Sequence, residues 1–190
     1  ARTYASYQEM VEKEKALPAD ERIDFVSIVT PNHTHGEIAK AFLEAGISVM
    51  CEKPMTMDLA TAKELGEIVK SSNVAFALNH NYTGYPMVKQ AKNMVETGVL
   101  GRLLKIVVEY PQGWLSCNLR DEDSKLSVWR MDPKYAGASC CMGDIGTHAE
   151  NLARYITGLE MEELCADLTG YIEGNQLDDD GNVLVHWENG

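Results

Sequence analysis

Three short polar stretches follow apolar runs in the first half of the chain, and each carries side chains that can bind or polarise a ligand. They are TPNHTH at 30–35, EKP at 52–54 and NHN at 79–81. In an open parallel sheet, ligands bind beyond the carboxyl ends of the strands. Pro54 confines the backbone of Lys53 to extended conformations, which limits where the ammonium group can point. A cation held in this way suits polarising a substrate oxygen or handling a proton.

The first two stretches also have structural interpretations, which stay open on the sequence alone. In the first, Pro31 ends a strand, and Asn32 or Thr34 can cap the helix that follows. His33 and His35 suggest metal only weakly, because no third and fourth ligand is evident nearby, and we therefore predict no metal site. The charged pair before the proline of the second stretch can be a surface salt bridge.

A fourth polar stretch, GDIGTHAENLARYITG at 143–158, places Asp144 four residues before His148. If a helix begins by residue 144, both side chains project from one face near its amino end. A carboxylate and an imidazole beside Gly143 and Gly146 are what a hydroxyl-deprotonating site requires. The structural alternative is an N-capping aspartate and a half-buried histidine, and the stretch alone favours neither.

A loop of mixed polarity is expected from about Leu115 to Ala138. Within it, Trp129 offers an aromatic face and Arg130 a guanidinium, which suit stacking and hydrogen bonding against a sugar. Burial of the tryptophan as a loop anchor is an equal alternative. Later in the chain, LDDDGN at 177–182 reads as a solvated hairpin turn rather than a cation site.

Composition excludes several classes of partner. The 190 residues are 45% hydrophobic and 24% charged, and 17 basic against 29 acidic residues give a net charge of -12. Such a charge would repel nucleic acid and anionic membranes. The sequence shows neither a stretch of about 20 apolar residues nor a signal peptide, so we expect a cytoplasmic protein. The five cysteines form no C-x-x-C pair. We predict reduced thiols, with Cys140 and Cys141 packing as small residues.

Hydrophobic periodicity predicts the elements that position these side chains. In the first half we expect a helix at 6–17, a strand at 23–30, a helix at 33–46, a strand at 47–53, a helix at 59–72 and a strand at 73–80. The nearly continuous apolar run at 23–30 is typical of a strand covered on both faces. This alternation predicts a parallel α/β sheet with right-handed crossovers.

The pattern changes in the second half, and we expect a domain boundary near 80–85. The predicted elements there are a helix at 85–98, a long strand at 101–114, a helix at 144–158 and strands at 163–173 and 182–188.

The stretches TPNHTH, CEKPMT and GDIGTHAENLARYITG, in this order and with these intervals, resemble the glucose-fructose oxidoreductase, inositol dehydrogenase and rhizopine-catabolism (Gfo/Idh/MocA) family. The likeness covers nearly the whole chain, and E-K-P and D-x-x-x-H are its specific parts. It implies an α/β fold with a partial Rossmann-type parallel sheet in an NAD(P)-binding domain at 1–82. A partial α+β domain with an open, mainly antiparallel sheet at 83–190 is implied to bind substrate and to build a homo-oligomer, a dimer or tetramer.

The resemblance also implies roles for individual residues. Lys53, Asp144 and His148 would be catalytic: the histidine as the base, the lysine polarising the substrate oxygen, and the aspartate holding a neighbouring hydroxyl or orienting the lysine. The residues implied to bind the cofactor are Thr30, Pro31, Asn32, His35, Glu52, Lys53 and Asn81. At Asn81 the family often carries an arginine, so this contact departs from the usual pattern.

A second departure concerns the phosphate-binding unit. The 15 glycines include no G-x-G-x-x-G spacing, so we expect these residues to be the central part of a longer protein and to be inactive alone. The function that follows is hydride transfer between NAD or NADP and a sugar, polyol or inositol-like alcohol. The alternatives are a sugar- or dinucleotide-sensing module without turnover and a metal-dependent hydrolase or isomerase.

Overall fold

The computed structural model describes residues 1–114 and 128–188. Within the chain, two compact units divide between Asn79 and His80, and each is described by itself below. Part of the predicted loop, 115–127, lies outside the described residues, and so does Cys117.

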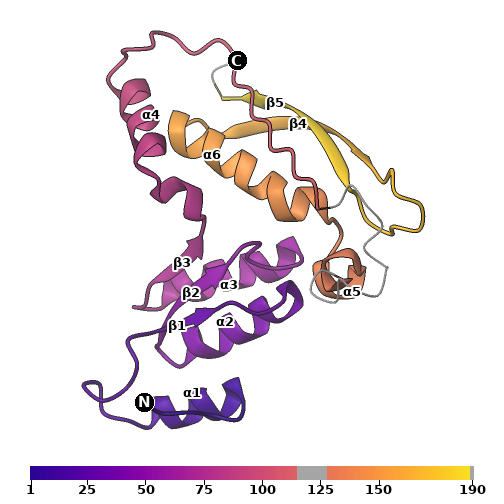
Figure 1. The fold of residues 1–190 in the computed structure, drawn as a ribbon. Helices are drawn as coiled ribbons and strands as arrows, with labels where there is room; N and C mark the ends of the chain where they lie inside the picture. The colour runs from indigo at the N-terminus through magenta and orange to yellow at the C-terminus, as the bar shows by residue number, and fades with distance from the viewer. Residues whose placement is uncertain (115–127, 189–190) are drawn as a thin grey trace. The chain divides into compact units, whose positions relative to one another are not determined.

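The first unit is built on a parallel sheet of three strands (Figure 1). The strands are β1 (Phe25–Ile28), β2 (Ser48–Glu52) and β3 (Phe76–Asn79), in the order β1-β2-β3. The helices are α1 (Tyr7–Lys15), α2 (His35–Glu44) and α3 (Leu59–Ser71), with a 3₁₀ turn η1 (Asn32–Thr34) before α2. Each parallel pair is joined through a helix, which confirms the predicted parallel α/β sheet.

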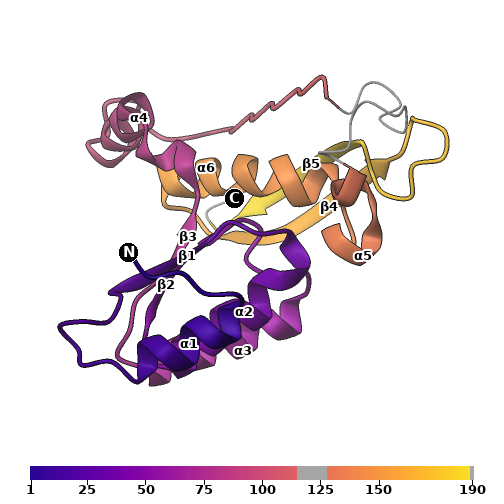
Figure 2. The same ribbon diagram turned by 60° about the horizontal axis from the view of Figure 1, so that its bottom comes forward.

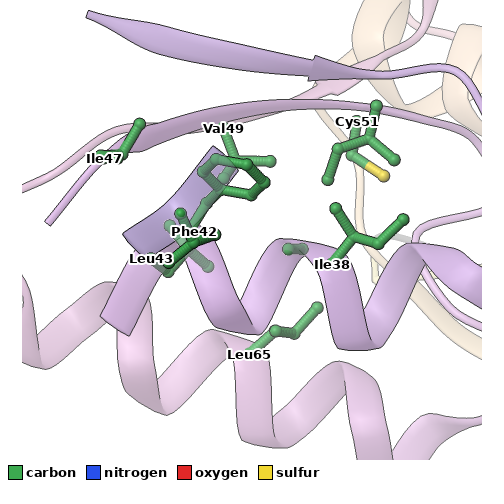
Figure 3. Close-up of a cluster of buried hydrophobic side chains, with 10 residues drawn as sticks. Ile38, Phe42, Leu43, Ile47, Val49, Cys51 and Leu65 are labelled. Atoms are coloured by element: carbon green, nitrogen blue, oxygen red, sulfur yellow. The ribbon is translucent and has the colours of Figure 1, made fainter. Parts of the chain in front are cut away.

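The core of this unit lies between the sheet and α2. The predicted apolar stripe of the helix is buried, with Phe42 fully inaccessible and Leu43 1% exposed. Val49 and Cys51 of β2 point toward this stripe, and Leu65 of α3 closes it from the other side of α2 (Figure 3). Burying one such side chain stabilises a fold by about 1.5–3 kcal/mol. This apolar layer therefore fixes the central strand β2 against α2.

Within the first unit, none of the helices covers the opposite face of the sheet. Helices α2 and α3 lie on the same side of the strands (Figure 2), and the register places Ser27 opposite Met50 on the other side. There, Phe25 is 55% exposed and Met50 is 37% exposed. The prediction that 23–30 is covered on both faces is therefore wrong for the described residues: the side chains alternate between a packed face and an open face.

A buried carboxylate fastens α1 and the segment before it. Glu14 is inaccessible, and its Oε1 lies 2.8 Å from Nε of Arg2. It also accepts hydrogen bonds from the Tyr4 hydroxyl and from the backbone amide of Ile23 at 2.9 Å. These donors, with Arg2 first among them, lower the pKa of Glu14 from 4.5 to about 2.

The second unit combines helices with an antiparallel hairpin. Its elements are η2 (Asn81–Gly84), α4 (Pro86–Glu96), η3 (Val128–Met131), α5 (Pro133–Ala136), the π-helical turn η4 (Met142–Gly146), α6 (Thr147–Thr157), β4 (Met161–Thr169) and β5 (Asp180–Trp187). Helix α4 packs against α6 (Figure 1). In neither unit is a described helix long and apolar enough to cross a membrane.

Two sequence predictions fail in this unit, and a third holds only in part. The stretch 101–114, predicted as a long strand, forms neither helix nor strand. Part of the predicted loop, 128–136, is instead helical as η3 and α5. LDDDGN lies only partly in the predicted hairpin connection. Residues 177–179 belong to the loop between the antiparallel strands β4 and β5, but Asp180 already begins β5 and Leu177 is buried rather than solvated. A strand needs a partner strand, which a local pattern does not show. The helical turns η3 and α5, by contrast, close local hydrogen bonds, such as that from the amide of Ala136 to the carbonyl of Asp132.

We expect Glu14 to make stability depend on pH in the acid range. Because its pKa is about 2 in the fold and 4.5 ordinarily, its contribution is complete above about pH 4.5 and is lost as the pH falls toward 2. In Glu14→Gln, urea unfolding across this range should show a shallower pH dependence than in the unsubstituted protein. Above about pH 5 the difference between the two proteins should stay constant; a difference that keeps changing there would contradict this account.

Candidate active site

Polar side chains converge at the carboxyl edge of the sheet in the first unit. Glu52 and Asn79 end neighbouring strands in register, and the Asn79 amide donates a hydrogen bond to the Glu52 carboxylate. The hydroxyl oxygens of Thr30 and Thr34 lie 2.6 Å apart. Thr34 donates to the carbonyl of Pro31 at 2.8 Å and makes no side-chain cap on α2. The expectation that the Thr34 side chain caps this helix is therefore wrong; its hydroxyl is used within the 3₁₀ turn η1 that precedes α2.

His35 joins the ends of β1 and β2. Its side chain is 1% exposed. Nε2 lies 2.8 Å from the carbonyl oxygen of Thr30, and Nδ1 lies 2.8 Å from that of Pro54. Carbonyl oxygens only accept, so the imidazole donates to one of them in either neutral tautomer and to both when it carries two protons. The histidine is thus placed to fix both strand-end loops.

Lys53 follows β2 directly, with its side chain partly exposed. The peptide bond between Lys53 and Pro54 is cis, which the sequence did not predict. Of the remaining residues predicted to bind the cofactor, Pro31 and Asn32 lie at the end of β1, where both are partly exposed. Asn81 opens η2 in the second unit and is exposed.

In the second unit, His148 lies on α6 within an aromatic cluster. Its side chain is 6% exposed. The centre of its ring lies 4.6 Å from that of Tyr82, 5.7 Å from that of His80 and 6.4 Å from that of Tyr110. The hydroxyl groups of the two tyrosines are hydrogen-bonded to each other. Sequence reasoning missed these three neighbours, although His80 and Tyr82 directly follow a strand end at which ligands were expected.

The hydrogen bond between the two tyrosines extends the pH range over which the phenol of Tyr82 is neutral. The hydrogen bond to Tyr110, together with burial and the nearby negative charge of Asp144, raises the pKa of Tyr82 to about 12. At neutral pH, the ring that contacts His148 is therefore uncharged.

Asp144 lies inside the π-helical turn η4 and is partly exposed. Its amide donates to the carbonyl of Cys140 at 2.9 Å, and Thr147 donates its hydroxyl proton to the carbonyl of Asp144 at 3.0 Å. Asp144 is therefore not an N-cap. A π turn separates it from His148, so the α-helical spacing rule used on the sequence does not apply unchanged. Such turns are frequent at functional sites.

Two other predictions concern η3 and the start of η4. The guanidinium carbon of Arg130 lies 4.4 Å from the ring centre of Trp129, so the two side chains stack on each other. Cys140 and Cys141 are buried free thiols in a small apolar cluster, which confirms the packing interpretation. Burial raises the pKa of Cys140 to about 12 and that of Cys141 to about 11.

The donor set can be compared with the cofactors and metals that such sites hold. In 1–114 and 128–188, no three His, Cys, Asp or Glu side chains are grouped so as to hold a metal ion. The carboxyl edge of the sheet, by contrast, presents an amide, a carboxylate and a hydroxyl, with the amide and the carboxylate already oriented by their hydrogen bond. This set fits a dinucleotide, whose ribose and nicotinamide offer both donors and acceptors.

Comparison with known proteins gives matches over both units. Residues 1–80 match the Gfo/Idh/MocA oxidoreductase family, NAD-binding Rossmann fold. Residues 88–190 match the Gfo/Idh/MocA C-terminal domain.

Three individual proteins illustrate the similarity. Levoglucosan dehydrogenase of Pseudarthrobacter phenanthrenivorans is 38% identical over 88% of this chain and 41% of its own length. An oxidoreductase structure from Sinorhizobium meliloti is 44% identical, with a TM-score of 0.81 over 98% of this chain and 46% of its own. An inositol dehydrogenase homologue from Azotobacter vinelandii, complexed with NADH and myo-inositol, is 30% identical, with a TM-score of 0.88 over 98% and 47%. The chain thus spans less than half the length of each.

We expect Tyr110→Phe to lower the pKa of Tyr82. The substitution removes the hydrogen bond that is the largest cause of the shift to about 12, so the pKa should fall toward the ordinary value of about 10. A ¹³C NMR titration of the tyrosine Cζ signals between pH 8 and 11 measures this. Tyr85→Phe is the control, since Tyr85 packs against the Tyr82 ring but lacks that hydrogen bond. An equal effect of both substitutions would contradict the account.

Proposed function

The chain belongs to the Gfo/Idh/MocA oxidoreductase family, and on this premise we propose that the protein is an NAD(P)-dependent dehydrogenase of a sugar, polyol or inositol-like alcohol. The observation that carries the proposal is the pair of family matches across both units, with the E-K-P lysine in the first match and the D-x-x-x-H pair in the second. Relatives named for levoglucosan and inositol support the substrate class.

The first unit is proposed to hold the cofactor, which supplies hydride transfer at nicotinamide C4 when it is bound. Thr30, Glu52 and Asn32 would hydrogen-bond it from the carboxyl ends of the strands. His35 contributes by fixing the two loops from which these groups project. Pro31, Lys53 and Asn81 complete the proposed cofactor-binding set. NAD and NADP stay equally open.

The reacting groups are proposed to be Lys53, Asp144 and His148. When a hydroxyl is oxidised to a carbonyl, its proton passes to the imidazole of His148. Lys53 donates a hydrogen bond to the same oxygen and stabilises the negative charge that develops there. Asp144 accepts a hydrogen bond from a neighbouring hydroxyl or orients the lysine. The neutral Tyr82 ring excludes water from one side of His148.

The substrate and assembly are proposed more broadly. Arg130, stacked on Trp129, would hydrogen-bond sugar hydroxyl groups with the outer edge of its guanidinium. A homo-oligomer would form through the sheet of the second unit, where Leu164 and Leu184 are 59% and 77% exposed. Neither the sensing module nor the metal-dependent hydrolase gains a favouring observation from the described residues.

Lys53→Met in the complete protein tests the role of the lysine. We expect kcat to fall by about 100-fold or more, the effect of losing one preorganised donor at a developing charge. The assay follows reduced nicotinamide at 340 nm with NAD or NADP and a panel of sugars and polyols. Lys63→Met is the matched control, because Lys63 is exposed on α3 and should keep wild-type turnover. Near-normal turnover of Lys53→Met would contradict this role and favour the alternative that the lysine forms a surface salt bridge.

His148→Asn tests the base. An acceptor that must be neutral makes oxidation speed up as the pH rises, so kcat/KM of the unsubstituted protein should climb through neutrality, with an apparent pKa that belongs to the coupled site. In the variant, kcat/KM should no longer rise with pH, and the rate should fall by about 100-fold to 10,000-fold. Cofactor affinity should be nearly unchanged. His186→Asn, at an exposed position of β5, is the control. An unaltered pH limb in His148→Asn would assign the base to another group.

A further inference from the structure

Four backbone amides open the helical run that carries Asp144 and His148. The first hydrogen bond inside this run goes from the amide of Asp144 to the carbonyl of Cys140. The amides before it have no partner within the helix. They belong to Cys140, Cys141, Met142 and Gly143. Where these amides are paired therefore decides where the helix starts and how it is rotated.

The side chain of Asp178, from the segment before β5, accepts hydrogen bonds from two of the four. Its Oδ1 lies 2.9 Å from the amide nitrogen of Cys140, and its Oδ2 lies 2.9 Å from that of Met142. A carboxylate at this end of a helix also interacts favourably with the helix dipole. Charge-assisted hydrogen bonds of this kind are about twice as strong as neutral ones.

The other two amides are paired through the same residue. The backbone carbonyl of Asp178 accepts from the amide of Cys141 at 3.1 Å. The hydroxyl of Ser139 donates to Oδ2 of Asp178 at 3.0 Å and accepts from the amide of Gly143 at 3.0 Å. All four amides are thus paired, directly or through one serine, by Asp178, which is 36 to 39 positions away from the residues that it bonds directly.

Close packing beside this contact leaves little room for another arrangement. A Cβ at Gly181 would lie 2.7 Å from the sulfur of Met142, and a Cβ at Gly146 would lie 2.5 Å from its terminal methyl. The methionine of η4 is therefore enclosed between two glycines, one in β5 and one in its own turn. The start of β5 and the π turn are in direct contact.

We infer that Asp178 is a positioning residue for the reaction, because it sets the start and rotation of the helical run that presents Asp144 and His148. This inference rests on the proposed dehydrogenase function. A displacement of about 1 Å in a reacting group can cost about 100-fold in rate. A residue that touches no reacting atom can therefore control turnover through the helix.

The neighbouring residue provides a matched control. The carboxylate of Asp179 also accepts three hydrogen bonds, from the amides of Tyr171 at 2.8 Å and Ile172 at 3.0 Å and from the side chain of Asn175 at 3.0 Å. These donors all belong to the loop between β4 and β5. Asp178→Asn and Asp179→Asn make the same chemical change at adjacent positions, but only the first touches the helix.

The test compares both variants in the complete protein. In Asp178→Asn, one acceptor oxygen becomes an amide group that faces backbone donors. Hydrogen exchange of the amides at 140–144 should become about tenfold faster, as expected for losing about one hydrogen bond. NMR signals of the His148 ring, set partly by the Tyr82 ring 4.6 Å away, should shift. In Asp179→Asn, exchange should quicken only at 171–175, and the His148 signals should stay in place.

Turnover supplies the second measurement. In Asp178→Asn, kcat should fall by about 10-fold to 100-fold with cofactor affinity within about twofold, whereas Asp179→Asn should stay within about twofold in kcat. Ser139→Ala removes one donor to Asp178 and the acceptor of Gly143, so it should act in the same direction with a smaller loss. It also serves if Asp178→Asn does not fold.

The outcomes separate this inference from the proposed function. Equal loss of kcat in both aspartate variants would reduce Asp178 to a general stabilising residue, and unaltered His148 signals in Asp178→Asn and Ser139→Ala would overturn the inference. If the His148 signals shift as expected but the unsubstituted protein oxidises no sugar or polyol with either cofactor, the positioning contact stands and the dehydrogenase proposal fails.

Discussion

Backbone groups at the ends of helices and strands must find hydrogen-bond partners, and this constraint shapes both units of the protein. Inside a helix or sheet, the regular backbone hydrogen bonds pair these groups, but the groups at the ends of the element have no such partner. Three buried or partly buried side chains meet this need. Glu14 accepts from the amide of Ile23, His35 lies between two carbonyl oxygens, and Asp178 gathers the amides that open a helical run. Two of these contacts adjoin proposed reacting groups. Lys53 directly precedes Pro54, whose carbonyl contacts His35, and the helical run held by Asp178 carries Asp144 and His148.

The two units use apolar packing differently. In the first, one continuous apolar layer lies between β2 and α2, and the buried polar side chains, Glu14 and His35, lie beside it in hydrogen-bonded contacts. In the second, the buried apolar cluster around Cys140 is small, and hydrogen bonds from Asp178 and Asp179 organise the segments around it. Removing a polar side chain should therefore disturb the second unit locally, whereas truncating a core side chain of the first should weaken the whole unit.

The chemistry proposed for this family member depends on control of protonation. The hydrogen bond with Tyr110 and burial raise the pKa of Tyr82 to about 12, so its phenol stays neutral even in alkaline solution and adds no charge beside His148. Asp144 lies in a π turn, where the backbone departs from α-helical geometry. A helix that starts in an irregular turn is stabilised less by its own backbone hydrogen bonds. The hydrogen bonds from its first amides to the carboxylate of Asp178 therefore contribute more to holding its start in place.

Sequence by itself determined the elements of the first unit, because helical and strand periodicities are local, and the predicted apolar stripe of α2 is its buried face. The types and spacing of Lys53, Asp144 and His148, together with the family resemblance, also predicted these three residues as reacting groups. Only the tertiary structure decided three other features. These are the conformation of 101–114, the aromatic neighbours of His148 and the contacts of Asp178. The physical reason is that a strand needs a partner strand, a ring needs neighbours, and an orphan amide needs an acceptor. For the ring and the amides, these partners come from tens of residues away, whereas 101–114 pairs with no strand in the described residues.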